Sequence, residues 1–524
     1  MPPGPESPAE GRPGPGPGPV TRPAGRRRLA AAAWLAGGLA LTALLVRISL
    51  TARVMSDGGN NALQAWDLLH GHLLLHGWQI GDANYYFLEL PLMALTEAVF
   101  GLGEFAQHVS SALTYTLITA AAAAIAVTGS RGPARAARGA AVLAVMAAPL
   151  FAGTTFLVLE EPDHTGTSLF ILGSILLIDR LPARRLTAPL LLVILTAGQF
   201  EDLTVRYVAV PAIAAVCAYR TLAARSLRSP DTLLAGTALV SVPLSALFGR
   251  LWVHLGGFTT ARPRGGLSPV HQWPHHVLLT WTNIRILFGA ANASHVAPGW
   301  KAYFGLTCVF AGVLGLAWVA WRWRRASRAE QLIAAAIVIN VGICVVTSFA
   351  TAGNAPHELA AVLPCGAALA ARALVPARIK STATALAAVT ATALIAALPL
   401  AYAATRPAFQ SPKAPLAAWL EAHGLTYGLA SYDDGSTVTV LTGNRIQLQA
   451  VHVGARRIAR SHYEVREDWY FPAQHDATFA VANAAQHLPV SVVLHNFGKP
   501  AATYKVDNWT IMVYKKNLLR LVRL

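Results

Sequence analysis

The chain has 524 residues, of which 54% are hydrophobic and only 13% are charged, and its formal net charge is +17. This balance excludes an ordinary soluble domain, in which about a quarter of the residues are charged. The positive charge does not indicate nucleic-acid binding, because much of it lies in short segments between apolar runs, where it orients a membrane protein and attracts anionic headgroups. We therefore expect a membrane protein in contact with the lipid bilayer, and no nucleic-acid partner.

Residues 1–28 are rich in Pro and Gly and predict a disordered tail. Apolar runs of the length that a membrane-spanning helix needs, about 20 residues, recur between residues 29 and 403. The predicted spans are 29–50, 108–128, 139–158, 166–179, 187–200, 203–219, 231–249, 303–321, 330–349, 358–375 and 382–403. We therefore predict a polytopic α-helical membrane region over 29–403, with about 11 transmembrane helices.

The segments between these runs alternate in charge. One set is rich in Arg, as in Arg131 to Arg138, Arg220 to Arg228 and Arg322 to Arg328. The other set is nearly free of Lys and Arg and contains isolated acids. Because short basic loops stay in the cytoplasm, we predict a cytoplasmic N-terminus and two long external loops, 51–107 and 250–302. An odd number of spans then places the C-terminus outside, whereas an even number would place it inside.

Residues 404–524 contain no spanning stretch. They combine an amphipathic stretch near 415–423 with short β-like runs at 436–441, 491–494 and 509–514. We predict a soluble extracytoplasmic α/β domain that is large enough for its own core. Its segments Tyr432 to Ser436 and Phe471 to Asp476 receive no catalytic role, since Asp-Gly is ordinary turn chemistry. We expect this domain to contact an acceptor or a partner.

The first external loop opens with Ser56-Asp57-Gly58-Gly59-Asn60. Asp57 therefore places a carboxylate at the outer membrane surface, where the flanking glycines allow backbone or a ligand to approach closely. A carboxylate in this position can accept the proton of a sugar or peptide hydroxyl. The alternative is that Asp57 caps a helix that starts near Asn60.

The string SDGGNNALQAWDLLHGHLLLHGW from Ser56, with Leu90-Pro91 and Phe100-Gly101 downstream, resembles the first external loop of the GT-C superfamily of membrane glycosyltransferases. Protein O-mannosyltransferases, aminoarabinose transferases and uncharacterised bacterial members belong to that superfamily. The resemblance covers residues 30–210 at the level of motifs and the rest only in layout. It implies a GT-C-like fold in the bacterial plasma membrane, a polyprenyl-phosphate sugar donor, a sugar, lipid or protein acceptor, and Asp57 as the catalytic carboxylate.

Many of these relatives carry Asp-Glu where this chain has Asp57-Gly58, so a second acid must come from elsewhere. The second external loop position offers one in the segment Glu160-Glu161-Pro162-Asp163-His164. Its side chains can bind acceptor hydroxyls or cap the next helix. Alternatively, Asp57, Glu161 and His164 can hold a divalent metal ion through oxygen and nitrogen ligands.

Binding of a lipid phosphate by such an enzyme also requires cationic side chains. The loop 250–302 has no acid between Arg250 and Lys301, and its Arg262 and Arg264 suit bidentate binding of an anionic lipid phosphate. General attraction to headgroups is the alternative. Arg206 is a third candidate, although Asp202 and Arg206 have the i,i+4 spacing of an ordinary helix pair. His357 and Glu358 replace an Arg-Tyr pair of several relatives, so we assign them no role.

These patterns favour a glycosyltransferase that moves a sugar from a polyprenyl-phosphate donor to an external acceptor, with Asp57 as general base and inversion at the anomeric carbon. A transporter or lipid flippase is the main alternative, but such proteins often contain internal repeats, and we find none. A catalytically silent membrane scaffold with the same architecture is the other alternative.

Overall fold

The computed structural model describes residues 24–152, 154–159, 163–181, 185–261, 266–291, 299–349, 356–359, 361–379, 382–454, 457–486 and 488–523. Four of the predicted site residues, Glu160, Glu161, Arg262 and Arg264, lie outside these ranges.

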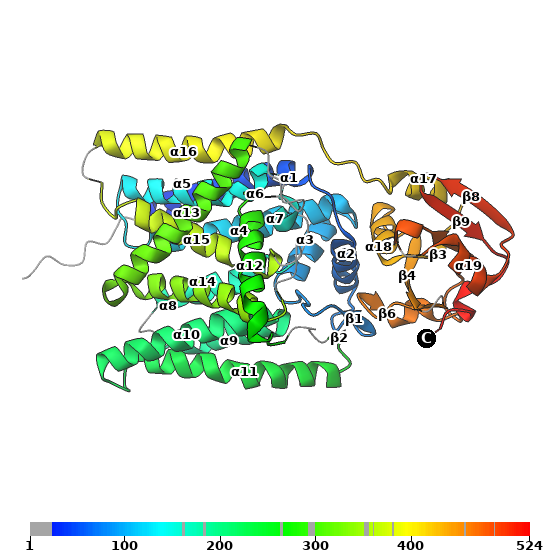
Figure 1. Cartoon of the computed structure of the whole chain (residues 1–524), viewed down its shortest axis with the longest axis horizontal. Helices are drawn as coiled ribbons and strands as arrows, with labels where there is room; N and C mark the ends of the chain where they lie inside the picture. The colour runs from blue at the N-terminus through cyan, green and yellow to red at the C-terminus, as the bar shows by residue number, and fades with distance from the viewer. Residues whose placement is uncertain are drawn as a thin grey trace, which may run out of the picture.

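A bundle of helices forms most of the molecule, and a smaller α/β region lies at one end of it (Figure 1). The helices up to the end of the bundle are α1 (Ala24–Ser49), α2 (Ser56–Leu69), α3 (Glu89–Phe100), α4 (Glu104–Val127), α5 (Pro133–Met146), α6 (Ala148–Ala152), α7 (Phe156–Leu159), α8 (Thr167–Arg180), α9 (Thr187–Glu201), α10 (Leu203–Ala224), α11 (Pro230–His254), α12 (Trp273–Leu287), α13 (Gly299–Trp321), α14 (Arg328–Val346), α15 (Val362–Leu374) and α16 (Thr382–Thr405).

Among the described residues, seven helices are long and apolar enough to cross a membrane. They are α1, α4, α10, α11, α13, α14 and α16. The other predicted spans are also helical but shorter: α5, α8, α9 and α15 have 13 to 15 residues. The chain is therefore a multi-pass membrane protein, while the count of 11 spans is not confirmed. The predicted span 139–158 breaks after α5, close to Pro149, which lacks a backbone N–H.

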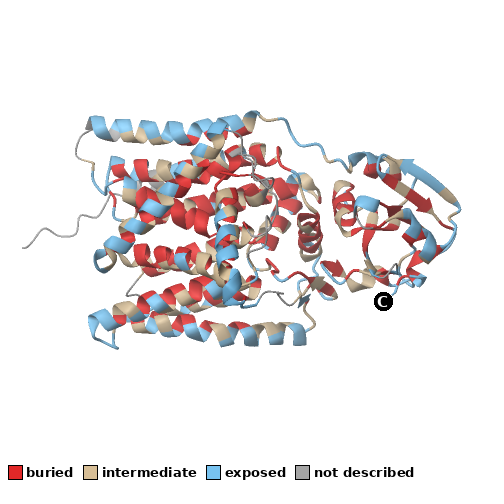
Figure 2. Ribbon diagram, viewed as in Figure 1, coloured by how far each residue is buried: buried red, intermediate tan, exposed pale blue. Residues whose placement is uncertain are grey.

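Helices at the edges of the bundle are more exposed than helices at its centre, as expected if the edges face lipid. α11 and α16, at the two edges of the bundle, are largely exposed, whereas α4 and α15 are largely buried (Figure 2). The loop 250–302 contains a helix that the sequence did not predict. This helix, α12, lies across the direction of the other helices (Figure 1).

The basic segments gather at one end of the bundle, as the charge pattern predicts. Arg138 donates to the backbone oxygen of Val375 at 3.0 Å, and Arg372 pairs with Glu330 at 3.0 Å. Asp231 forms ion pairs with Arg220 of α10 and Arg328 of α14. The α/β region lies at the opposite end (Figure 1).

The C-terminal region, residues 414–523, folds around a six-stranded mixed sheet with the order β5-β4-β3-β7-β9-β8. Its elements are α17 (Ala414–Ala422), β3 (Tyr427–Ala430), α18 (Tyr432–Leu441), β4 (Gln447–Gly454), β5 (Arg457–Arg460), β7 (Phe479–Ala482), α19 (Val490–Phe497), β8 (Ala502–Val506) and β9 (Trp509–Val513).

Two of the three predicted β-like runs in this region are helical, so those predictions were wrong. Residues 436–441 belong to α18, which Ser431 caps by accepting a hydrogen bond from the backbone N–H of Asp434. Residues 491–494 belong to α19. In both helices the Val-rich sequence favours a strand locally, but buried positions on one helix face override that preference. The run at 509–514 forms β9, and the stretch near 415–423 forms α17.

A second, three-stranded sheet ties the C-terminal region to both long loops. It has the order β2-β1-β6, where β1 is Trp78–Ile80, β2 is Thr259–Thr260 and β6 is Val465–Arg466. Gln79 pairs with Thr259 in parallel and with Val465 in antiparallel register. In addition, α18 packs on α2. Loops 51–107 and 250–302 therefore meet the C-terminal region at one place.

Candidate functional site

Asp57 lies in the first turn of α2, which begins at Ser56 after Met55 as the N-cap residue. The alternative that Asp57 caps a helix starting near Asn60 is therefore wrong. Its half-buried carboxylate lies at the positive end of the helix dipole, which favours negative charge.

Two side chains of the C-terminal region complete the surroundings of Asp57. The hydroxyl of Tyr432 lies 2.5 Å from Oδ1 of Asp57 and also 2.5 Å from Oε2 of Glu464. Sequence analysis assigned no role to the segment from Tyr432 to Ser436, and the structure corrects this. Tyr432 is the first residue of α18, and Glu464 directly precedes β6, so the packing of α18 on α2 and the small sheet bring both to Asp57.

The hydroxyl of Tyr432, which has a single proton, lies between the carboxyl groups of Asp57 and Glu464. A phenolic hydroxyl has one proton to donate, so one of the two carboxyls must itself be protonated and donate to the phenolic oxygen. Burial, together with the charge of Asp57, holds the pKa of Glu464 well above its ordinary value. This direction favours Glu464 as the carboxyl that keeps its proton, with Tyr432 donating to Asp57.

The pKa of Asp57 is itself raised by burial, and the hydrogen bond from Tyr432 offsets part of this rise. Its other oxygen, Oδ2, accepts no hydrogen bond from any residue that the structure describes. Asp57 thus combines an available oxygen with a basicity above that of an ordinary aspartate.

Gly59 allows the close approach that the sequence predicted. A Cβ atom at this position would lie 3.1 Å from Oγ of Ser436 and 3.2 Å from its backbone carbon. Ser436 donates to the backbone oxygen of Ser56 at 2.9 Å, and Ser56 donates to Asp433 at 2.9 Å. The N-terminus of α2 and the N-terminus of α18 are therefore held in direct contact beside Asp57.

A second cluster of acids and imidazoles adjoins Asp57. Nδ1 of His164 lies 2.6 Å from Oδ2 of Asp202, and His357 stacks on His164 with a ring-centroid distance of 5.4 Å. Asp163 lies 3.5 Å from Nδ1 of His357. The charges of Asp163 and His357 both act on the pKa of Asp57, so the two clusters belong to one electrostatic site.

The pair of His164 and Asp202 is ionised. Burial alone would lower the pKa of His164, but the charges of Asp202 and Glu358 and the hydrogen bond that His164 donates to Asp202 raise it well above its ordinary value. Burial alone would likewise raise the pKa of Asp202, but His164 and hydrogen bonds lower it to about 2. Asp202 therefore does not pair with Arg206, whose Nε donates to Gln199 at 3.4 Å. Among the described residues, no carboxylate neutralises Arg206.

Glu161 lies outside the described residues, so the metal set of Asp57, Glu161 and His164 stays a prediction. The one group of described side chains with metal-ligand atoms within 4.8 Å of one another is Asp163, His164 and His357, without Asp57. We therefore derive no metal-dependent step.

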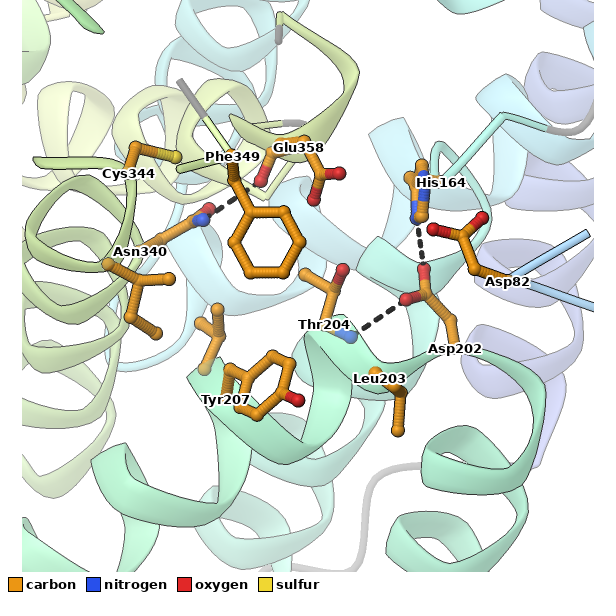
Figure 3. Close-up of a pocket in the computed structure, with 12 residues that line it drawn as sticks. Asp82, His164, Asp202, Leu203, Thr204, Tyr207, Asn340, Cys344, Phe349 and Glu358 are labelled. Atoms are coloured by element: carbon orange, nitrogen blue, oxygen red, sulfur yellow. Dashed lines mark hydrogen bonds and ion pairs between the residues drawn. The ribbon is translucent and has the colours of Figure 1, made fainter. Parts of the chain in front are cut away.

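A small pocket of about 30 Å³ opens beside this cluster (Figure 3). One end is polar and contains Asp82, His164, Asp202 and Glu358, and the other is formed by side chains of α10 and α14 with Phe349. Asn340 of α14 donates to the backbone oxygen of Glu358 at 2.9 Å. His357 and Glu358, to which we assigned no role from the sequence, thus lie at this site. The pocket thus joins a polar, charged group of side chains to an apolar surface between α10 and α14.

Backbone strain is concentrated here. Tyr85, His164 and Glu464 all have left-handed φ angles, of 51°, 59° and 50°. Such conformations are costly for residues other than glycine and cluster at functional sites. The strained backbone of His164 donates to the hydroxyl of Tyr85 at 3.3 Å. The three residues come from three distant segments, which strengthens the assignment of one site.

Sequence reasoning missed Asp82, Glu89, Tyr432 and Glu464. Burial raises the pKa of Glu89 to about 8, and its Oε1 accepts from the backbone N–H of Gly166 at 3.1 Å. Asp82 and Glu89 carried a usable signal, since both are isolated acids in a loop nearly free of Lys and Arg. Tyr432 and Glu464 carried none, because only the folded C-terminal region brings them to Asp57.

The fold is similar to that of solved structures of ArnT. ArnT from Cupriavidus metallidurans in the apo state is similar over 94% of this chain and 100% of its own, with a TM-score of 0.55 and 14% identity. The same ArnT bound to undecaprenyl phosphate matches over 94% of this chain and 99% of its own, with a TM-score of 0.54 and 14% identity.

An oligosaccharyltransferase from Archaeoglobus fulgidus tethered with an acceptor peptide matches over 92% of this chain and 74% of its own, with a TM-score of 0.45 and 12% identity. No protein-family model and no curated protein matches the chain. At these identities, the likeness to ArnT establishes the fold, and the chemistry must be argued from the site.

Proposed function

We propose that this protein is a glycosyltransferase that moves a sugar from a polyprenyl-phosphate donor to a hydroxyl of an acceptor, with Asp57 as general base. The observation that carries the proposal is the position of the Asp57 carboxyl group, which accepts a hydrogen bond from the hydroxyl of Tyr432 at the junction of the helical bundle and the C-terminal region. The GT-C fold supports the reaction class.

In this reaction Oδ2 of Asp57 accepts the proton of the acceptor hydroxyl as its oxygen attacks the anomeric carbon. The bond between that carbon and the phosphate oxygen breaks, and polyprenyl phosphate leaves with the electron pair. Because the attack comes from the face opposite the phosphate, the anomeric configuration inverts. A general base is most effective when its pKa lies near the working pH, so the raised pKa of Asp57 favours this role.

The donor lipid would enter the amphipathic pocket between α10 and α14, with its phosphate toward the polar end. The protonated His164 supplies positive charge there, where negative charge develops as the phosphate leaves. Arg206, on α10 and without a carboxylate partner among the described residues, is a further candidate for the phosphate. Arg262 and Arg264 remain candidates from the sequence alone.

The orientation follows from charge. The basic segments at one end of the bundle would lie in the cytoplasm, and Asp57 with the C-terminal region would lie outside, at the surface of the bacterial plasma membrane. In this orientation the acceptor arrives from the extracytoplasmic side. Asp163, next to His357, is available to bind an acceptor hydroxyl.

The experiment is transfer of radiolabelled sugar from a polyprenyl-phosphate donor by the purified protein in lipid nanodiscs, with wild type and Asp57→Asn compared. General-base catalysis typically contributes about 10²–10⁴-fold, so the variant should lose that much rate. Asp476→Asn, which removes an exposed carboxylate of the C-terminal region, is the matched control. A transporter or silent scaffold would show no Asp57-dependent transfer.

A further inference from the structure

A second cavity, of about 140 Å³, lies between α2 and the C-terminal region, separate from the pocket at His164. We call it the interface cavity. The residues that define it here are Asn60, Trp66 and Asp67 from α2, and Asn444, Gln447 and Trp469 from the C-terminal region. Both walls come from elements that α18 and the small sheet hold together, so the cavity exists only in the assembled molecule.

Two amides give this cavity unused hydrogen-bonding capacity. The side chains of Asn444 and Gln447 are partly buried, and neither hydrogen-bonds with any residue of the described chain. Each amide offers two N–H donors and a carbonyl acceptor. Asn444 also has a left-handed φ of 67°. Groups of this kind suit a ligand whose hydroxyls both donate and accept.

The charges of the cavity are already neutralised. Oδ2 of Asp67 accepts from Arg466 at 2.8 Å and from the indole N–H of Trp78 at 2.8 Å. Arg466 also pairs with Asp468 at 2.6 Å. Among the described residues that line the cavity, Arg466 is the one Lys or Arg, and it is already paired, so the chemistry favours a neutral ligand.

Two indoles complete the cavity. Trp66 and Trp469 are partly exposed and line it from opposite walls. Trp469 is held in place by an edge-to-face contact with the buried Trp78, at a ring-centroid distance of 5.0 Å. Indoles provide broad apolar surface at little conformational cost. Apolar faces interleaved with amides match the alternating C–H and hydroxyl surfaces of a sugar ring.

We propose that the interface cavity binds a neutral carbohydrate portion of the acceptor. The inference rests on the proposed function, because it takes the ligand to be the molecule that receives the sugar. Asn60 lines the cavity one helical turn after Asp57 and lies beside Glu464, which shares Tyr432 with Asp57. An acceptor chain bound along α2 would therefore end next to the general base.

The test is binding of neutral trisaccharides of mannose, glucose and arabinose to the full-length protein in nanodiscs, measured by saturation-transfer NMR. Gln447→Ala and Asn444→Ala each remove hydrogen bonds to the ligand and should weaken binding of the best trisaccharide about five- to tenfold. Gln474→Ala, an exposed amide of the same region that does not line the cavity, should bind like wild type.

The variant Asp57→Asn distinguishes a failure of this inference from a failure of the proposed function. It should abolish transfer but leave trisaccharide binding unchanged, because Asp57 does not line the cavity. If Asp57→Asn still transfers sugar while binding depends on Gln447, the role of the base is wrong and the cavity stands. If no trisaccharide binds the wild type, or if Gln447→Ala and Asn444→Ala bind as tightly as Gln474→Ala, the inference is overturned.

Discussion

The hydroxyl of Tyr432 lies 2.5 Å from Oδ1 of Asp57, although 375 residues separate the two in sequence. The contact means that the C-terminal region is part of the reaction centre and more than an appended domain. It also makes the ionisation of Asp57 depend on a group from another part of the fold.

Replacing Tyr432 by Phe should shift the pH profile of transfer. The hydrogen bond from Tyr432 lowers the pKa of Asp57, so its removal raises that pKa and leaves less of the base ionised at low pH. The rising limb of the rate should therefore move to higher pH, with a rate near wild type on the alkaline plateau. Tyr504→Phe, an exposed tyrosine of the same region, should leave the profile unchanged. An unshifted limb in Tyr432→Phe would disprove the coupling.

Replacing Asp202 by Asn should destabilise the protein in a pH-dependent way. Breaking a buried ion pair costs about 3–5 kcal/mol. The lowered pKa of Asp202 means that its contribution is present above pH 3.8 and is lost as the pH falls to about 2. The raised pKa of His164 means that its contribution is present below pH 6.5 and is lost as the pH rises through the folded-state value.

The thermal midpoint of Asp202→Asn should therefore fall furthest below wild type near pH 5 and approach it at alkaline pH. Glu421→Gln, which breaks an exposed pair with Arg445, should change the midpoint little at any pH. A deficit in Asp202→Asn that does not vary with pH would argue against the charged pair.

Replacing Gly59 by Val should loosen the contact between α2 and α18. A side chain here meets Ser436, including its backbone, at 3.1–3.2 Å, so one of the two helices must move. We expect faster tryptic cleavage after Lys413, between α16 and α17, and a shift of the rising limb of transfer to higher pH as Tyr432 moves from Asp57. Gly236→Val, where nothing lies within 4 Å, is the control. Equal cleavage of both variants would show that this close approach is unimportant.

Removal of divalent metal ions by a chelator should not reduce the rate of sugar transfer. The group of Asp163, His164 and His357 has the spacing of a metal site, but it does not include Asp57, the proposed base. Treatment with EDTA followed by dialysis should therefore not reduce the rate. A loss of activity that added Mn²⁺ or Mg²⁺ restores would instead place a metal in the mechanism.

The helical membrane region could be predicted because apolar runs and charged loops are local signals. The number of spans could not, since α5, α8, α9 and α15 are helices of 13 to 15 residues inside longer apolar runs. In the C-terminal region, Val-rich segments suggested strands at positions where α18 and α19 form. There the partners that decide the element come from distant parts of the chain.

Some residues of the candidate site could likewise be predicted from the sequence, and others could not. Asp57 followed from its position after the first span, and Asp163 and His164 followed from an acid-rich loop. His357 and Glu358 were set aside because they depart from a family pattern, yet they contact or adjoin His164. Tyr432 and Glu464 required tertiary structure, because no periodicity or spacing links them to Asp57.

The most direct measurement of the central claim is the rate of sugar transfer by Asp57→Asn in lipid nanodiscs, next to wild type and Asp476→Asn. Our account predicts a loss of about 10²–10⁴-fold for Asp57→Asn, with unchanged thermal stability and a normal rate for Asp476→Asn. Transfer by Asp57→Asn at the wild-type rate would contradict it.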